Sequence, residues 1–132
     1  MPGEINLAHA LNSMSVDCDN VLYGFASEPM PLETKLTDFE AAIREKEGTT
    51  IIAKSEYLDS QKIKYEGPYA KLTINIHTSL ELVGLTAALA AKLTEQGISA
   101  NVVAAFFHDH IYVPYEQRQK AINAILSLKD EN

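Results

Sequence analysis

Residues 71–114 read KLTINIHTSLELVGLTAALAAKLTEQGISANVVAAFFHDHIYVP, and this stretch decides the fold. In residues 71–77 apolar and polar side chains alternate, which predicts a strand with one buried and one polar face. Thr78 and Glu81 have the spacing of a capping box, so we expect a helix to begin there and to end at Gly97. The buried stripe of this helix consists of leucines at helical spacing: Leu82, Leu85, Leu89 and Leu93.

The rest of the second half adds a hairpin and a final helix. Residues 98–107 and 110–114 are mostly apolar and predict two strands, with the turn between them at His108 and Asp109. Residues 115–128 show helical spacing, and three of their side chains are expected to point inward: Ile122, Ile125 and Leu126. The second half therefore has the order strand, helix, strand, strand, helix.

The first half shows a similar order with weaker signals. Thr37 and Glu40 repeat the capping-box spacing, and Gly48 stands where a left-handed residue would end a helix. In order, the expected elements are a helix at residues 5–14, a polar stretch at 15–20, strands at 21–27 and 32–36, a helix at 37–48 and a strand at 49–53.

The element order fits a duplicated ferredoxin-like motif, β-α-β-β-α-β. The first copy lacks its opening strand and the second its closing strand, which two copies that share or exchange strands would explain. We predict an α+β protein with two ferredoxin-like units in tandem, residues 1–62 and 63–132, with antiparallel sheets and helices on one face. The boundary is expected between Leu58 and Tyr69. A single irregular α+β domain is the alternative.

The composition narrows the class of protein. The 132 residues are 46% hydrophobic and 22% charged, which is typical of a folded domain. A net charge of −7 with scattered basic residues argues against nucleic acid as a partner. No apolar run reaches the roughly 18 residues that a membrane-spanning helix needs. With one cysteine, Cys18, and no signal-peptide pattern at the start, we expect a cytoplasmic protein.

Residues 77–126, HTSLELVGLTAALAAKLTEQGISANVVAAFFHDHIYVPYEQRQKAINAIL, resemble the ACT domain, a small ligand-binding module of amino-acid-regulated enzymes. In the first half, residues 22–25 (LYGF) and 39–53 (FEAAIREKEGTTIIA) are similar to the first copy of small bacterial tandem-ACT proteins. The CASTOR proteins and the regulatory domains of aspartate kinases look like more distant kin. The resemblance implies a tandem-ACT fold, a small-molecule ligand such as an amino acid, and a homo-oligomer, expected to be a dimer.

By position, the resemblance also implies a ligand site where the first strand of the second unit turns into the helix. The hydroxyls of Thr78 and Ser79 would face the ligand's carboxylate. The floor and the closing strand of the site would consist of Val83, Gly84, Leu85, Asn101 and Val102. Many ACT domains have an acidic residue and a proline before the glycine, whereas this chain has Leu82 and Val83, so mainly backbone contacts are expected. A capped helix with Gly84 serving only packing is the alternative.

Three histidines and a carboxylate form a further candidate cluster: His77, His108, Asp109 and His110. The first and third strands of a ferredoxin-like sheet are antiparallel neighbours, so His77 is expected to lie beside His110. Imidazole and carboxylate groups could bind zinc. His108 and Asp109 are expected to occupy the turn itself, and the sequence has no conventional metal-binding motif, so we favour a polar rim of the sheet that binds no metal.

The sequence gives weak support for catalysis and none for a cofactor. It contains no nucleophile elbow and no P-loop. Ser79 lies near His77 without any assurance of geometry, and the carboxylates beside Cys18 disfavour its thiolate. We therefore predict a non-catalytic regulatory protein that binds a small molecule, an amino acid in particular. The alternative is a structural or adaptor protein that uses its ACT folds for self-assembly or for partnering an enzyme.

Overall fold

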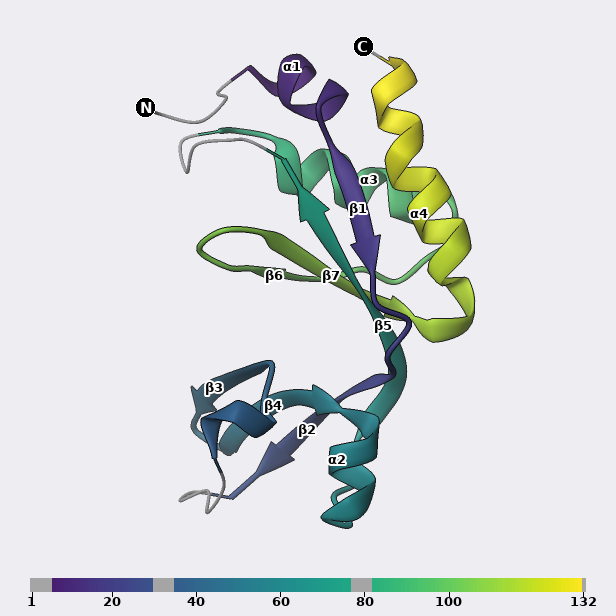
Figure 1. Ribbon diagram of the computed structural model, residues 1–132. Helices are drawn as coiled ribbons and strands as arrows, with labels where there is room; N and C mark the ends of the chain where they lie inside the picture. Colours follow the sequence, from purple (N-terminus) through teal and green to yellow (C-terminus); the bar gives the residue numbers. More distant parts are fainter. Residues whose placement is uncertain (1–5, 30–34, 77–81, 132) are drawn as a thin grey trace.

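A computed structural model of the protein describes residues 6–29, 35–76 and 82–131 (Figure 1). The helices are α1 Leu7–Asn12, α2 Ser55–Ser60, α3 Leu85–Glu95 and α4 Arg118–Leu126, with short 3-10 helices η1 Leu36–Asp38, η2 Tyr115–Gln117 and η3 Ser127–Glu131. The strands are β1 Ser15–Cys18, β2 Tyr23–Glu28, β3 Ala41–Glu45, β4 Gly48–Lys54, β5 Glu66–Asn75, β6 Asn101–Ala104 and β7 Asp109–Pro114. No helix in these ranges is long and apolar enough to cross a membrane.

One antiparallel sheet runs through the described residues, in the strand order β3-β4-β2-β5-β7-β6. The central strand β5 pairs with β2 along its first half, with β1 along its second half, and with β7 along its other edge. The sheets of the two predicted units are therefore joined through β5, and β1 lies with the C-terminal half. The expected boundary between residues 62 and 63 stays a prediction.

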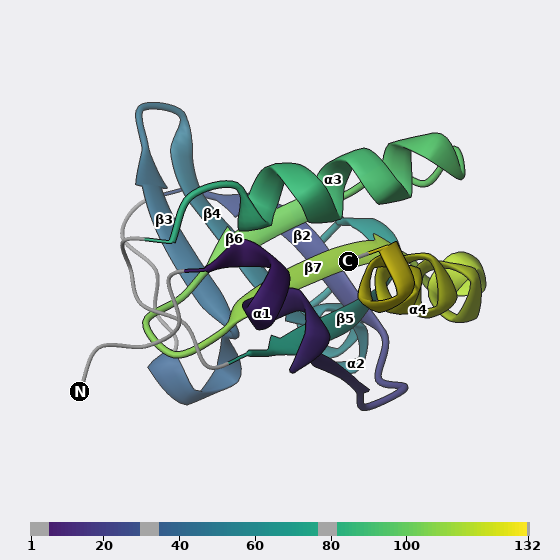
Figure 2. The same cartoon turned by 90° about the horizontal axis from the view of Figure 1, so that it is seen from above.

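The helices lie on one face of this sheet, as predicted. Along β5, Ala70, Leu72 and Ile74 are fully buried in a core that also includes residues of α1, α3 and α4. Figure 2 shows these three helices on the same side of β5 and β7. Each fully buried leucine or isoleucine contributes about 1.5–3 kcal/mol to stability. A smaller core lies under α2 in the N-terminal half and consists of Ala26, Ile51, Ala53 and Leu58.

We call the face of the sheet opposite the helices its inner face. At its centre, side chains from the strands bury one another on this face. Tyr23 of β2 and Tyr112 of β7 are 1% and 2% exposed, and their rings meet edge to face with centroids 5.8 Å apart. These two tyrosines belong to a hydrophobic cluster. Its described residues lie in strands or in the β1–β2 connection, and none of them lies in a helix. Because Tyr23 and Tyr112 belong to different halves, the sheet must curl until the inner faces of its two halves meet.

The helix predicted at residues 37–48 is wrong. These residues form η1 and then β3, which pairs with β4 from Ala41 opposite Ile52 to Glu45 opposite Gly48. Pairing with β4 satisfies the backbone of β3 and outweighs the helix propensity of its sequence, AAIRE. Gly48 has a φ of 152°, and a Cβ there would lie 2.5 Å from the carbonyl oxygen of Glu28. This glycine therefore permits a close approach of two strands and does not end a helix.

The start of the chain and the start of α3 also differ from the sequence-based expectation. Residues 15–18 of the expected polar stretch form β1, from which Val16 and Cys18 pack against the C-terminal core. The helix α3 begins at Leu85 and not after Thr78. Gly84 is its N-cap, with a left-handed φ of 97°. The capping-box prediction for this helix is therefore wrong, because the chain enters the helix through a glycine turn.

Three further expectations have mixed outcomes. Leu82 precedes α3, while the other three leucines of the predicted stripe are buried in it. In α4, Ile125 is buried as predicted, but Ile122 and Leu126 are only partly buried because Ala121 and Ala124 take the inward positions. Residues 32–34 of the predicted short strand lie outside the described residues, and Leu36 begins η1.

Candidate ligand-binding site

A pocket of about 300 Å³ lies between the start of α3 and the turn that joins β6 to β7. Small-molecule sites typically measure ~300–1,000 Å³, so this pocket suits a small metabolite. Three alanines and five larger side chains form its apolar wall, the larger ones being Ile76, Leu82, Leu85, Phe106 and Phe107. Its polar groups come from the backbone at Gly84 and from Thr86, His108 and Asp109.

The start of α3 gives the pocket one polar end. The left-handed φ of Gly84 is rarely adopted by other residues and lets the chain turn directly into the helix. The N–H of Ala88 donates to the carbonyl oxygen of Gly84 at 2.9 Å, and the cap residue itself provides no side-chain hydrogen bond. The amides that precede Ala88 and the hydroxyl of Thr86 lie at the positive end of the helix. This end favours a carboxylate.

The turn between β6 and β7 forms the opposite side of the pocket. The N–H of Ala105 donates to the carbonyl oxygen of His108 at 3.0 Å, which places Phe106 and Phe107 at the tip of the turn. Their rings pack edge to face with centroids 4.9 Å apart, and the two residues are 78% and 81% exposed. The hairpin was predicted, but its turn is earlier than expected, since Asp109 already belongs to β7.

Asp109 gives the pocket a carboxylate. It lies opposite Ile74 of β5 and Ala104 of β6 in the sheet. Cross-strand partners point to the same face, and Ile74 is buried under the helices, so Asp109 points to the helix side. Partial burial raises the pKa of Asp109 above its ordinary value, and this effect is opposed by the neighbouring His110. A cationic group in the pocket would compensate for the solvation that this carboxylate has lost.

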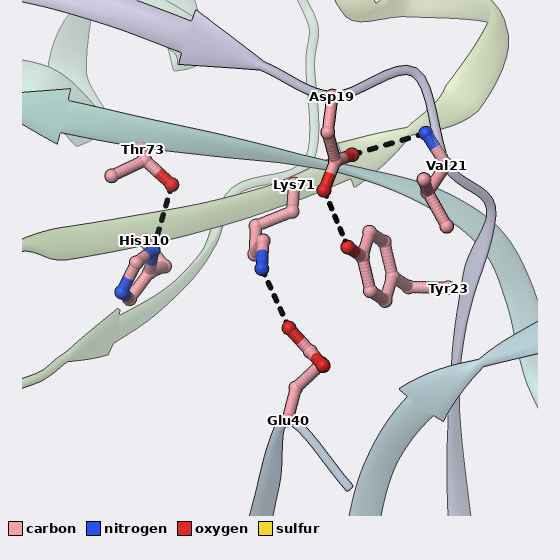
Figure 3. A network of polar contacts seen from close by, with 7 residues as sticks. All are labelled: Asp19, Val21, Tyr23, Glu40, Lys71, Thr73 and His110. Atoms are coloured by element: carbon pink, nitrogen blue, oxygen red, sulfur yellow. Dashed lines mark hydrogen bonds and ion pairs between the residues drawn. The ribbon is translucent and has the colours of Figure 1, made fainter. Parts of the chain in front are cut away.

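A separate group of polar contacts lies on the inner face of the sheet (Figure 3). The Nζ of Lys71 lies 2.6 Å from the Oε1 of Glu40 and 5.0 Å from the centroid of the Tyr23 ring. The hydroxyl of Tyr23 donates to the Oδ2 of Asp19 at 2.6 Å. Burial and the Asp19 carboxylate raise the pKa of Tyr23, so its hydroxyl stays protonated. These contacts connect the two halves of the sheet.

His110 lies beside this group and faces away from the pocket. Its Nδ1 is 2.9 Å from the Oγ1 of Thr73, its cross-strand partner on β5. Burial lowers the pKa of His110, and the positive charge of Lys71 and the proximity of His108 lower it further. The imidazole is therefore held in its neutral form, as a hydrogen-bonding partner of Thr73.

The predicted cluster of histidines and Asp109 is divided between the two faces of the hairpin. The rings of His108 and His110 are 6.2 Å apart, centroid to centroid, whereas Asp109 points to the helix side. His77, predicted to neighbour His110, lies outside the described residues. Among the residues that the structure describes, no three histidine, cysteine, aspartate or glutamate side chains are placed to hold a metal ion together.

The residues predicted for the ligand site are brought together only in part. Gly84 and Leu85 line the pocket, whereas Val83 is 84% exposed and is not part of the lining. Asn101 uses its side-chain amide to donate to the carbonyl oxygen of Tyr112 at 3.2 Å, and Val102 packs against the C-terminal core. Thr78 and Ser79 lie outside the described residues.

Several lining residues were not among those predicted from the sequence, and they include Thr86, Phe106 and Phe107. The sequence pattern predicts Phe106 and Phe107 at the end of a strand, but two adjacent phenylalanines cannot both point to the buried face of a strand. Their position just before the predicted turn could have indicated that they lie at the tip of the hairpin. No comparable signal distinguishes Thr86 from any other threonine near a helix start.

Comparison with known families identifies the chain. One model of the ACT domain matches residues 64–127, and a second ACT-domain model matches residues 2–70, more than half of the chain. This protein belongs to the ACT-domain family. The two matches follow one another along the sequence, so the tandem-ACT prediction is confirmed. A comparison with curated proteins gives no match.

Solved structures show the same fold over nearly the whole chain. A Vibrio cholerae protein of unknown function, described as a possible transport protein, is 36% identical, with a TM-score of 0.84, and the match covers 93% of this chain and 95% of the other. An aspartate kinase from Clostridium acetobutylicum is 10% identical, with a TM-score of 0.66, over 87% of this chain and 33% of the kinase. The ligand-free regulatory subunit of aspartate kinase from Thermus thermophilus is 13% identical, with a TM-score of 0.58, over 86% and 95% of the two chains. At these low identities, the two kinase structures support the fold alone.

Proposed function

We propose that this tandem-ACT protein is a non-catalytic regulator that binds a free α-amino acid in the pocket between α3 and the β6–β7 turn. The observation that carries the proposal is the combination, in one pocket, of a helix start and the carboxylate of Asp109. An α-amino acid is a zwitterion whose carboxylate and ammonium are both attached to the α-carbon. The helix start would bind the carboxylate, and Asp109 would bind the ammonium.

The proposed site includes part of the site expected from the sequence. Gly84 and Leu85 form its floor, and Thr78 and Ser79 would add hydroxyls from the preceding segment. Val83, Asn101 and Val102 do not line the pocket and are left out of the proposed ligand contacts. Membership of the ACT-domain family supports a regulatory role, in which the protein would report the concentration of its ligand to a partner. We also propose that the protein works as a homodimer in the cytoplasm.

An adaptor that binds no metabolite is the competing proposal, and it has one observation of its own. Val83, Phe106 and Phe107 expose large apolar side chains close to the pocket, with exposed fractions of 84%, 78% and 81%. Exposed apolar side chains that lie together often belong to a protein interface. A ligand in the pocket and a partner protein bound around the mouth of the pocket would contact the same side chains. Measuring whether a small molecule binds therefore distinguishes the two functions.

A thermal-shift screen of the twenty common amino acids, with nucleotides as unrelated compounds, tests the proposal. A ligand present at about 100 times its Kd stabilises a protein by about 2.7 kcal/mol, which is an easily measured shift in Tm. We expect at least one amino acid to raise the Tm and to bind in calorimetry with one site per chain. If no amino acid binds while the protein still forms a stable complex with itself or with an enzyme, the adaptor function is the correct one.

A further inference from the structure

We propose that the pocket selects α-amino acids with uncharged, apolar side chains and that Asp109 is the residue that recognises their ammonium group. This inference rests on the proposed function and adds the class of ligand. The proposal is based on the whole lining of the pocket, which combines one carboxylate, one helix start and otherwise mainly apolar side chains. None of these features would define a ligand alone.

The lining can pair with one positive group of a ligand through Asp109 and with one negative group through the start of α3. Among the described lining residues, Asp109 is the only carboxylate, and there is no lysine or arginine. A ligand with a second carboxylate, such as glutamate, or with a phosphate would therefore bring a negative charge that meets no lysine or arginine there, only the imidazole of His108. A lysine or arginine ligand would bring a second positive charge, and Asp109 would already be paired with the α-ammonium.

The apolar wall indicates where the ligand's side chain lies. Ile76 and Leu82 line the pocket beside the approach to α3, and Phe106 and Phe107 line it at the hairpin tip. Each methylene of a ligand that is transferred from water to such a wall raises affinity roughly fourfold. Branched and aromatic amino acids thus gain most, whereas a charged side chain would have to be desolvated against the same surfaces.

The placement of Asp109 supports its role as the ammonium partner. The residue lies on β7, where pairing with Ile74 and Ala104 fixes its backbone and directs its side chain to the helix side of the sheet. No hydrogen bond from another described residue to this carboxylate is present in the structure, although His110 influences it electrostatically. As far as the described residues are concerned, its carboxylate oxygens can accept hydrogen bonds from an ammonium group.

Calorimetry on the full-length protein with matched ligands tests the inference. L-leucine is compared with 4-methylpentanoate, which lacks the ammonium group, and with 3-methylbutylamine, which lacks the carboxylate. In the wild type, we expect leucine to bind roughly 10- to 100-fold more tightly than 4-methylpentanoate, because the latter leaves Asp109 unpaired. In Asp109→Asn this preference should shrink to a few-fold. Glu116→Gln, which changes an exposed carboxylate of η2, is the matched control and should keep the wild-type preference.

A second variant keeps the test decisive if Asp109→Asn does not fold. Thr86→Val keeps the shape of the side chain and removes its hydroxyl at the helix start. It should weaken leucine and 4-methylpentanoate equally, by about 3- to 10-fold, and leave 3-methylbutylamine unchanged. This pattern would place the carboxylate at the helix start and leave the neighbouring ammonium to Asp109.

The outcomes distinguish this inference from the proposed function. Leucine, isoleucine, methionine or phenylalanine binding with a dependence on Asp109 supports both. Glutamate or lysine binding as tightly as leucine would overturn the selectivity for apolar side chains, and an unchanged preference for the ammonium in Asp109→Asn would overturn the role of Asp109, while amino-acid binding stands in both cases. If no amino acid binds, the proposed function and this inference fail together.

Discussion

The ammonium of Lys71 and the carboxylate of Glu40, 2.6 Å apart, form an ion pair across the inner face of the sheet. Lys71 lies on the shared strand β5, and Glu40 lies just before β3 at the far edge of the N-terminal half. Their side chains are only 18% and 26% exposed, so neither is a freely solvated surface group. The pair therefore connects the two halves of the sheet beside the buried rings of Tyr23 and Tyr112.

This ion pair should contribute measurably to stability. We expect Lys71→Met and Glu40→Gln each to lower the free energy of unfolding by about 1–3 kcal/mol, because each leaves a poorly solvated charge without its partner. The double variant should cost less than the sum of the two single variants. Urea denaturation of all four proteins measures this coupling. Lys120→Met, at an exposed lysine of α4, is the control and should change stability by less than about 0.5 kcal/mol. Strict additivity would show that the pair contributes nothing.

His110 should make the protein less stable at mildly acidic pH. Its pKa in the folded protein is lowered below the ordinary value of 6.5, so the unfolded chain takes up a proton before the folded one does. The stabilising contribution of the neutral imidazole is fully present above pH 6.5 and is lost as the pH falls through the lower, folded-state pKa.

Urea denaturation between about pH 7.5 and pH 5 measures this dependence. In His110→Asn, which keeps a hydrogen-bonding group near Thr73, the loss of stability over this range should be smaller than in the wild type. The exposed His9 of α1 provides the matched control variant, His9→Asn. An identical pH dependence in the wild type and in His110→Asn would contradict the assignment.

Sequence periodicity predicted the elements of the C-terminal half because their burial is regular. In β5 every second side chain enters the core, and in α3 Leu85, Leu89 and Leu93 do so at helical spacing. The helix predicted at residues 37–48 failed for the opposite reason. In β3 the side chains are mostly exposed, so the pairing of its backbone with β4, which leaves no periodic pattern in the sequence, determines its structure.

In the candidate site, too, the residues that could be predicted belong to one local feature of the sequence, and others are brought there only by tertiary contacts. Gly84 and Leu85 were identified because they lie in one local feature, the turn from a strand into a helix. Phe106 and Phe107 join them only when the β6–β7 hairpin folds against the start of α3, about twenty residues away in the sequence. The alternation of Asp109 and His110 between opposite faces could have been read from the sequence, but only once the turn had been placed correctly.

Gly84 should be intolerant of alanine, contrary to the expectation for a glycine inside a helix. Its φ of 97° is unfavourable for any residue with a Cβ, and the added atom would lie 3.3 Å from the Cδ2 of Leu7. We expect Gly84→Ala to lower the free energy of unfolding by about 1–3 kcal/mol. Gly97→Ala is the matched variant, because Gly97 also has a left-handed φ, 70°, but has open space around it. Its cost should be smaller, and a neutral or stabilising Gly84→Ala would contradict the described turn.

Asp109 should destabilise the folded protein at neutral pH when no ligand is present. Burial raises its folded-state pKa above the ordinary 3.8, so the folded protein binds this proton more readily than the unfolded chain does. The cost of burying the ionised carboxylate is present above the raised pKa and is relieved as the pH falls toward 3.8.

Asp109→Asn should therefore be more stable than the wild type at pH 7, and the difference should disappear as the pH approaches about 4. Urea denaturation of both proteins over this range, with Glu116→Gln as the exposed control, measures it. An added amino acid should reverse the order at neutral pH, because its ammonium group stabilises only the protein that carries the carboxylate. A variant that is less stable than the wild type at pH 7 without ligand would show that Asp109 already has a stabilising partner and is not held open for a ligand.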